Sequence, residues 1–176
     1  QSLNLRSADI KRVLAAFPII FNSDFKLNDL QNIYSTSLGD FSTEIKGLQK
    51  TFHLDSEPPN GFSTFLFLTH SSGKNAGLIN REFRRSEDGK VTVEHKLFKI
   101  EKKYQNQGVA SDINEHAEKE YEKFGIHSIS LDANAEIGGY AWARQGYDFM
   151  NDREKDKIQT IFKKFVTRMH KNGKIS

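Results

Sequence analysis

A short run of residues between two apolar segments has the composition of a phosphate-binding loop. The run YQNQGVASDI (104–113) contains Gln105, Gln107 and Gly108, and it joins a strand-like segment to a helical one. A helix that begins there exposes backbone N–H groups without intrahelical partners, and with the helix dipole these attract anions. Gly108 removes the Cβ that would hold a ligand away, and Ala110 keeps the first turn small. We therefore expect a pyrophosphate site, although a glycine after a strand often marks only a turn.

The same residues resemble the signature of a known family. In its order, QNQGVA (105–110) resembles the Arg/Gln-x-x-Gly-x-Gly/Ala motif of the GCN5-related N-acetyltransferases. The preceding segment LFKIEKKY (97–104) is similar to the fourth strand of that family and the approach to its loop. The resemblance covers about residues 62 to 150 and follows the order of elements more than residue identity. It implies acetyl-coenzyme A as the cofactor and a primary amine, in a small molecule or a protein, as the acceptor.

The resemblance also implies which residues contact the cofactor. The pyrophosphate of coenzyme A would bind the loop and the first helical turn, at Gln105, Gln107, Gly108, Val109, Ala110 and Ser111. The pantetheine arm would pair like an added strand with the backbone of Phe98, Lys99 and Ile100, in a slot where the fourth and fifth strands splay apart. Asn134, after the fifth predicted strand, would hydrogen-bond the pantetheine amide; its alternative role is to cap a turn.

Acetyl transfer to an amine needs a base that removes a proton from the nucleophile. Some members of the resembled family carry a glutamate base on the fourth strand, and Glu94 lies in the middle of that predicted strand. Its alternative role is a surface residue paired with a lysine. His95 points to the opposite face of the strand. It is the second candidate base, and its alternative role is a half-buried structural histidine.

The general acid of the family is not at its usual position in this chain. Many members have a tyrosine four residues before the final Gly-Phe strand, where this chain has Trp142, and indole does not donate a proton near neutral pH. We predict Tyr140 as the acid, with Tyr147 second; Tyr140 can equally pack in the core or line the acceptor slot. The missing tyrosine favours an alternative function, a non-catalytic coenzyme A-binding or interaction domain of a larger toxin- or phage-type protein.

Composition excludes several other functions. The net charge of +3, from 26 basic and 23 acidic residues, is a weak signal for nucleic acid, and a basic stretch from Lys157 to Lys174 is typical of a solvated helix face. The six histidines lack metal-ligand spacing and there is no cysteine, so we predict no metal. No apolar run approaches the roughly 20 residues of a membrane span. We expect a cytoplasmic protein, or one delivered into a host cytoplasm if it belongs to a toxin.

Hydrophobic periodicity predicts helices in the first third of the chain. Residues 7–17 form a predicted helix with Pro18 at its end. A longer helical pattern runs from Leu27 to Phe52 and can divide at Gly39, and no first strand of the family is evident. Because the chain begins with Gln1 rather than Met, we expect a processed product or a fragment.

The remainder of the chain alternates between strand-like and helical patterns. We predict strands at 61–70, 75–85 and 90–100, joined by hairpin turns, then a helix at 109–124, a strand at 126–133, a short helix at 137–145, a strand at 146–150 and a terminal helix from about 151. This order predicts a single α/β (α+β) domain, with a mixed, mostly antiparallel twisted sheet flanked by helices. We expect a helical N-terminal region, 1–60, and an acetyltransferase-like core with a C-terminal helix, 61–176.

Overall fold

Strands rich in Phe, Val, Ile and Thr form one five-stranded sheet in the computed structural model, which describes residues 7–35, 39–51 and 59–131. The chain divides into two compact units, Gln1–Leu131 and Asp132–Ser176, and every described residue belongs to the first. The strands are β1 Phe41–Lys50, β2 Gly61–His70, β3 Asn75–Arg85, β4 Val91–Ile100 and β5 Ile126–Leu131. The helices are α1 Ser7–Phe21, α2 Leu27–Tyr34 and α3 Val109–Lys123, with a short 3-10 helix, η1, at Lys102–Tyr104.

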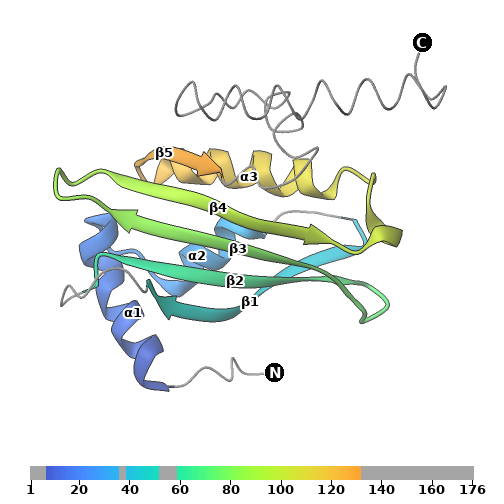
Figure 1. Cartoon of the computed structure of the whole chain (residues 1–176), viewed down its shortest axis with the longest axis horizontal. Helices are drawn as coiled ribbons and strands as arrows, with labels where there is room; N and C mark the ends of the chain where they lie inside the picture. The colour runs from blue at the N-terminus through green and yellow to red at the C-terminus, as the bar shows by residue number, and fades with distance from the viewer. Residues whose placement is uncertain (1–6, 36–38, 52–58, 132–176) are drawn as a thin grey trace, which may run out of the picture. The chain divides into compact units, whose positions relative to one another are not determined.

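The order of the strands in the sheet is the order in the sequence, β1-β2-β3-β4-β5 (Figure 1). The first four strands are antiparallel, and β5 is parallel to β4 because α3 forms the crossover between them. Gly73 and Gly89 have φ angles of 79° and 81° in the two hairpin turns, a conformation that glycine adopts without steric cost. This is the mixed, mostly antiparallel sheet with helices that the sequence predicts.

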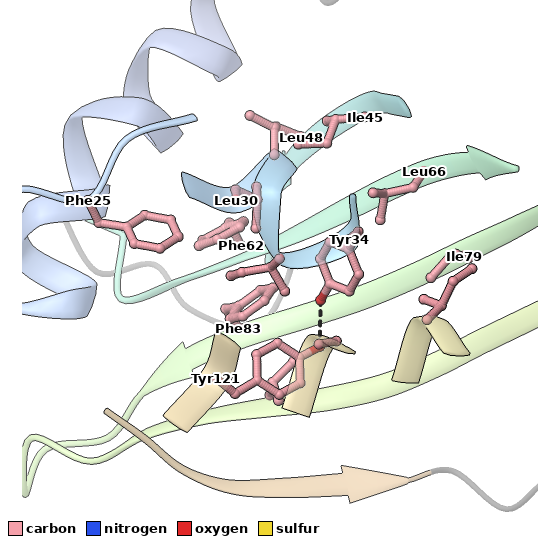
Figure 2. Close-up of a cluster of buried hydrophobic side chains, with 14 of the residues drawn as sticks. Phe25, Leu30, Tyr34, Ile45, Leu48, Phe62, Leu66, Ile79, Phe83 and Tyr121 are labelled. Carbon is pink, nitrogen blue, oxygen red and sulfur yellow. Dashed lines mark hydrogen bonds between the residues drawn. The ribbon is translucent and has the colours of Figure 1, made fainter. Parts of the chain in front are cut away.

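All three helices pack on one face of the sheet. Phe83, an inward residue of β3, contacts both Phe21 of α1 and Tyr121 of α3. Its ring also stacks on Phe62 of β2, with centroids 5.1 Å apart (Figure 2). The hydroxyls of Tyr34 and Tyr121 share a hydrogen bond of 2.6 Å, which joins α2 to α3 through this core. Each fully buried aromatic side chain contributes roughly 1.5–3 kcal/mol to folding, so this layer fixes the helices against the sheet.

The helix predicted across residues 41–52 is wrong over its described part, because residues 41–50 form β1. A bulge causes the misleading pattern: the register with β2 shifts between Ile45 and Gly47, so Lys46 is an extra residue. The bulge places Ile45 and Leu48 on the same inward face although they are three residues apart. A strand with a bulge thus imitates the spacing of a helix.

The first predicted helix ends later than expected. α1 continues through Pro18 to Phe21. An interior proline costs a helix about 3 kcal/mol. Phe17 and Ile20, on either side of Pro18, are both wholly buried, and their packing offsets that cost. The predicted strands at 61–70, 75–85 and 90–100 and the predicted helix at 109–124 are confirmed as β2, β3, β4 and α3 within one residue at each end.

Candidate functional site

The loop before α3 is open and holds its backbone in a left-handed turn. Gly108 has φ 77° and ψ 0° and stands at the N-cap of α3, where no side chain caps the helix. A Cβ placed on Gly108 would meet no protein atom within 4 Å. Gln105, Gln107 and Ser111 are exposed beside it. The first N–H groups of α3 therefore have no side-chain cap, and the anion site expected at this loop stays a prediction.

Side-chain hydrogen bonds tie this loop to the end of β4. Gln105 donates from Nε2 to the carbonyl oxygen of Ile100 over 2.9 Å. Tyr104, just before it, is buried, and its ring stacks on His70 with centroids 5.0 Å apart. Gln105 therefore closes the turn and orients the loop, a role for which its uncharged amide is suited.

Strand β4 extends beyond the described part of its partner β5. The ladder between the two strands ends at the pair His95 and Leu131, and β4 continues for five residues to Ile100 (Figure 1). A second bulge lies at the same place, in the pairing of β4 with β3. Arg81 of β3 pairs with His95, and the preceding Asn80 pairs with Leu97, so Lys96 is the extra residue. The backbone edge of β4 from Leu97 onward is thus free of the described part of β5.

The residues predicted to pair with pantetheine lie on this extension of β4. Phe98 and Ile100 are half-buried and face the helical side of the sheet, and Lys99 is exposed. An unpaired strand edge is a template for an added strand or an extended ligand. The extension leads through η1 directly to the Gly108 loop, so the end of β4 and the uncapped N-terminus of α3 follow each other closely along the chain.

Glu94, the predicted base, lies on the sheet face opposite the helices. It pairs across the sheet with Glu82 of β3 and Ser130 of β5, and its side chain is 36% exposed. The ammonium nitrogen of Lys96 is 3.9 Å from the Glu94 carboxylate. The lysine pairing considered as the alternative role of Glu94 is therefore present, and it leaves the carboxylate accessible.

Glu82 is a carboxylate that sequence reasoning missed. It is 5% exposed, and it pairs with Lys96 at 2.7 Å and with Arg84. Burial raises the pKa of this carboxyl, but the hydrogen bonds from Lys96 and Arg84 outweigh burial and hold the pKa below its usual value. Lys96, the bulged residue, therefore bridges Glu82 and Glu94. Only the cross-strand register reveals this link, because the two glutamates are twelve positions apart in the sequence.

His95, the second candidate base, is buried rather than half-buried. It is 3% exposed on the helical side of the sheet, the face opposite to Glu94, as the alternation of the strand predicts. Its Nε2 is 3.1 Å from the hydroxyl of Tyr121. Burial, together with the positive charge of Arg81, holds the pKa of His95 well below its usual value. A neutral, enclosed imidazole belongs to the core network.

Several predicted site residues lie outside the described residues. These are Asn134, Tyr140, Trp142 and Tyr147, together with the terminal basic helix. Within the described part of the chain, no helix is long and apolar enough to cross a membrane. The same residues contain no group of three or more His, Asp or Glu side chains arranged to hold a metal ion.

Comparison with known proteins places acetyltransferases among the structural neighbours of this chain. No protein-family model and no curated protein matches it. The chain is similar to solved structures of an acetyltransferase from Trypanosoma brucei (11% identity, TM-score 0.44) and a glucosamine-6-phosphate N-acetyltransferase from Arabidopsis thaliana (11%, 0.43). It is also similar to an aminoglycoside acetyltransferase from an uncultured soil sample (13%, 0.44). These matches cover 51% of this chain and 64%, 62% and 61% of the three proteins, so each match spans less than two thirds of the other protein.

Proposed function

We propose that this chain is an acetyl-coenzyme A-dependent N-acetyltransferase that acts on a primary amine. The observation that carries the proposal is the order of elements here: β4 continues past the described part of β5 and leads through η1 to the uncapped N-terminus of α3, where Gly108 leaves open space. A strand edge can hydrogen-bond the two amides of a pantetheine arm, and helix N–H groups can bind a pyrophosphate. Coenzyme A is an extended molecule that contains both groups in this order.

Features of the loop support binding of the cofactor. Gly108 leaves the space above the turn clear, and the N–H groups of Val109 and Ala110 belong to the first turn of α3. Lys102 and Lys103 are exposed on the approach to the loop and add positive charge near the proposed phosphates. When bound, acetyl-coenzyme A supplies the activated acetyl thioester.

The roles proposed for the chain in catalysis follow from acid–base chemistry. Glu94 accepts a proton from the amine, directly or through a water molecule, and thereby makes the nitrogen nucleophilic. The ammonium group of Lys96, 3.9 Å away, orients the Glu94 carboxylate. Tyr140 is proposed to protonate the departing thiolate, and Asn134 to bind the pantetheine amide. We propose a cytoplasmic setting, or a host cytoplasm if the chain is part of a delivered protein.

A binding experiment with a control ligand tests the proposal. Thermal unfolding is measured with and without acetyl-coenzyme A, and a ligand at 100 times its Kd stabilises the folded state by about 2.7 kcal/mol. Pantetheine, which lacks the pyrophosphate, is expected to shift the melting temperature much less. If millimolar acetyl-coenzyme A leaves the melting temperature unchanged, the proposal is wrong.

The second candidate function is a coenzyme A-binding module without catalysis, favoured by Trp142 at the position of the family tyrosine. Both proposed functions require binding of coenzyme A, and only the enzyme transfers the acetyl group to an acceptor. Release of free thiol is measured with a panel of polyamines, aminoglycosides, peptides and nucleotides as acceptors. Binding with no acceptor-dependent thiol release would establish the module.

A further inference from the structure

Arg81 is a wholly buried arginine in the middle of β3. Its side chain is 0% exposed, and no carboxylate within the described part of the chain forms an ion pair with it. Transfer of a charged group out of water is unfavourable unless other groups compensate it. Its Nε also has no hydrogen-bond partner among the described residues. An apolar residue would fill this position at lower cost, so the contacts of the guanidinium call for a reason beyond packing.

The first contacts of Arg81 are at the β4 bulge. Its Nη1 donates to the carbonyl oxygens of Asn80 and Leu97, both over 3.0 Å. Asn80 and Leu97 face each other across β3 and β4 immediately after the bulged Lys96. A bulge disrupts the local ladder of backbone hydrogen bonds. The guanidinium therefore supplies donors at this bulge, next to the last described pair of β4 and β5.

The second set of contacts joins the bulge to α3. Nη2 of Arg81 donates to Oδ1 of Asn114 over 3.2 Å, and Asn114 is 2% exposed in the second turn of α3. The guanidinium carbon also lies 5.5 Å from the centre of the Phe98 ring on the β4 extension. One side chain thus binds both elements that form the proposed coenzyme A surface.

We propose that Arg81 is a positioning residue that sets the spacing between the end of β4, at Leu97 and Phe98, and the N-terminal half of α3. Pantetheine and pyrophosphate are joined covalently, so their two binding surfaces must keep a fixed separation to engage one ligand. Arginine suits this role because its planar fork reaches several acceptors at once, whereas a lysine provides one point of contact. This inference rests on the proposed function, since the spacing matters only for a ligand that touches both elements.

Substitution of Arg81 tests the proposal through the affinity for the cofactor. Arg81→Met is expected to raise KM for acetyl-coenzyme A about 10- to 100-fold, because the two surfaces lose their common support. The effect on kcat at saturation is expected to be small, as for a residue that acts on binding alone. Arg81→Lys keeps the charge and is expected to recover only part of the affinity.

Arg85→Met is the matched control. Arg85 lies on the same strand and also bonds backbone carbonyls, those of Ile19 and Ile20 in α1, away from the cofactor surface. Its loss is expected to lower stability while KM stays at the wild-type value. Equal KM values in Arg81→Met and Arg85→Met would overturn the proposal.

A double-mutant cycle examines the link to α3. Asn114→Ala alone is expected to raise KM for acetyl-coenzyme A less than Arg81→Met does. The double variant is expected to raise KM no more than Arg81→Met alone, because the two residues share one contact. Fully additive effects on log KM would contradict the proposed link. If Arg81→Met does not fold, Arg81→Lys and Asn114→Ala carry the same comparison.

Amide hydrogen exchange without cofactor separates this inference from the proposed function. Arg81→Met is expected to accelerate exchange in 96–100 and 109–114 relative to Arg85→Met. Unchanged exchange in both segments would overturn the positioning role even if the enzyme is active. Accelerated exchange in a protein that binds no acetyl-coenzyme A would support the structural link and refute the proposed function.

Discussion

Gly108 and Glu94 are the two residues at which the proposed site can be tested most directly. Gly108 combines a left-handed backbone with open space above it, so substitution there adds no clash with the protein. The Glu94 side chain is 36% exposed on the sheet face opposite the helices, so its substitution leaves the core intact. At both positions the effect on function can be measured apart from the effect on packing.

Substitution of Gly108 is expected to abolish cofactor binding at a limited cost in stability. Gly108→Ala and Gly108→Val strain the left-handed turn by roughly 1–2 kcal/mol, and the Val side chain also blocks the phosphates. Thermal unfolding with and without acetyl-coenzyme A measures both effects. Gly125→Ala is the control, because Gly125 has φ 69° and equal open space at the other end of α3. A ligand-induced shift in Gly108→Val as large as in Gly125→Ala would contradict the prediction.

Glu94→Gln is expected to lower kcat by about 10²- to 10⁴-fold, the usual contribution of a general base, while acetyl-coenzyme A still binds. Thiol release under saturating acceptor measures kcat. Glu44→Gln is the control, because Glu44 is also on a strand, is half-exposed and pairs with a lysine two residues later, at 2.7 Å. If Glu94→Gln and Glu44→Gln both turn over at the wild-type rate, Glu94 is a surface residue and the base lies elsewhere.

At the scale of elements, α2 and α3 are joined through a buried polar contact. The hydroxyl of Tyr121 lies within hydrogen-bonding distance of both Tyr34 and Nε2 of His95. Burial raises the pKa of Tyr121 to about 12, so the hydroxyl stays protonated and can donate. This network connects helix α2 to strand β4 through the last turn of α3.

Tyr121→Phe is expected to lower the free energy of unfolding by about 1–3 kcal/mol, because it leaves buried polar atoms of two partners without their shared hydroxyl. Urea unfolding measures the change. Tyr104→Phe is the control, since Tyr104 makes its contacts with His70 and Phe41 through the ring. Equal losses in the two variants would show that the network contributes nothing to the docking of α3.

At the scale of the whole molecule, the buried His95 makes stability depend on pH. Its pKa is lowered in the folded protein by burial and by the charge of Arg81, so the unfolded chain binds the proton more readily. Above pH 6.5 both states are neutral at this residue, and its contribution to stability is fully present. As the pH falls below 6.5, the unfolded state gains protons and this stability is lost, down to the folded-state pKa.

Urea unfolding between pH 7.5 and 5 is expected to show this loss, with at most about 1.4 kcal/mol per pH unit from one histidine. His95→Gln removes the titrating group and is expected to flatten the curve over that range. His127→Gln is the control, because His127 is exposed on β5. If the free energy of unfolding of His95→Gln falls with pH as steeply as that of the wild type, the pH dependence belongs to other groups.

The sequence by itself determined the elements whose patterns are local. β2, β3 and β4 alternate regularly between the glycine turns, and α3 repeats apolar residues on one face, so their existence and order follow from periodicity. The turn at Gly108 is also a local feature, because the positive φ angle of this one residue is what requires a glycine. These features were sufficient to predict the sheet and the loop of the proposed site.

Only the tertiary structure decided the features that depend on cross-strand pairing. The bulge at Lys46 gave strand β1 the spacing of a helix, and the bulge at Lys96 shifted the pairing of β4 with β3. The burial of Arg81, and the lysine shared by Glu82 and Glu94, likewise depend on which residues face one another across strands. A periodic pattern in the sequence shows which face of a strand a residue lies on. It does not show which residue lies opposite on the next strand, because long-range packing sets that register. The contacts of the candidate site depend on the register.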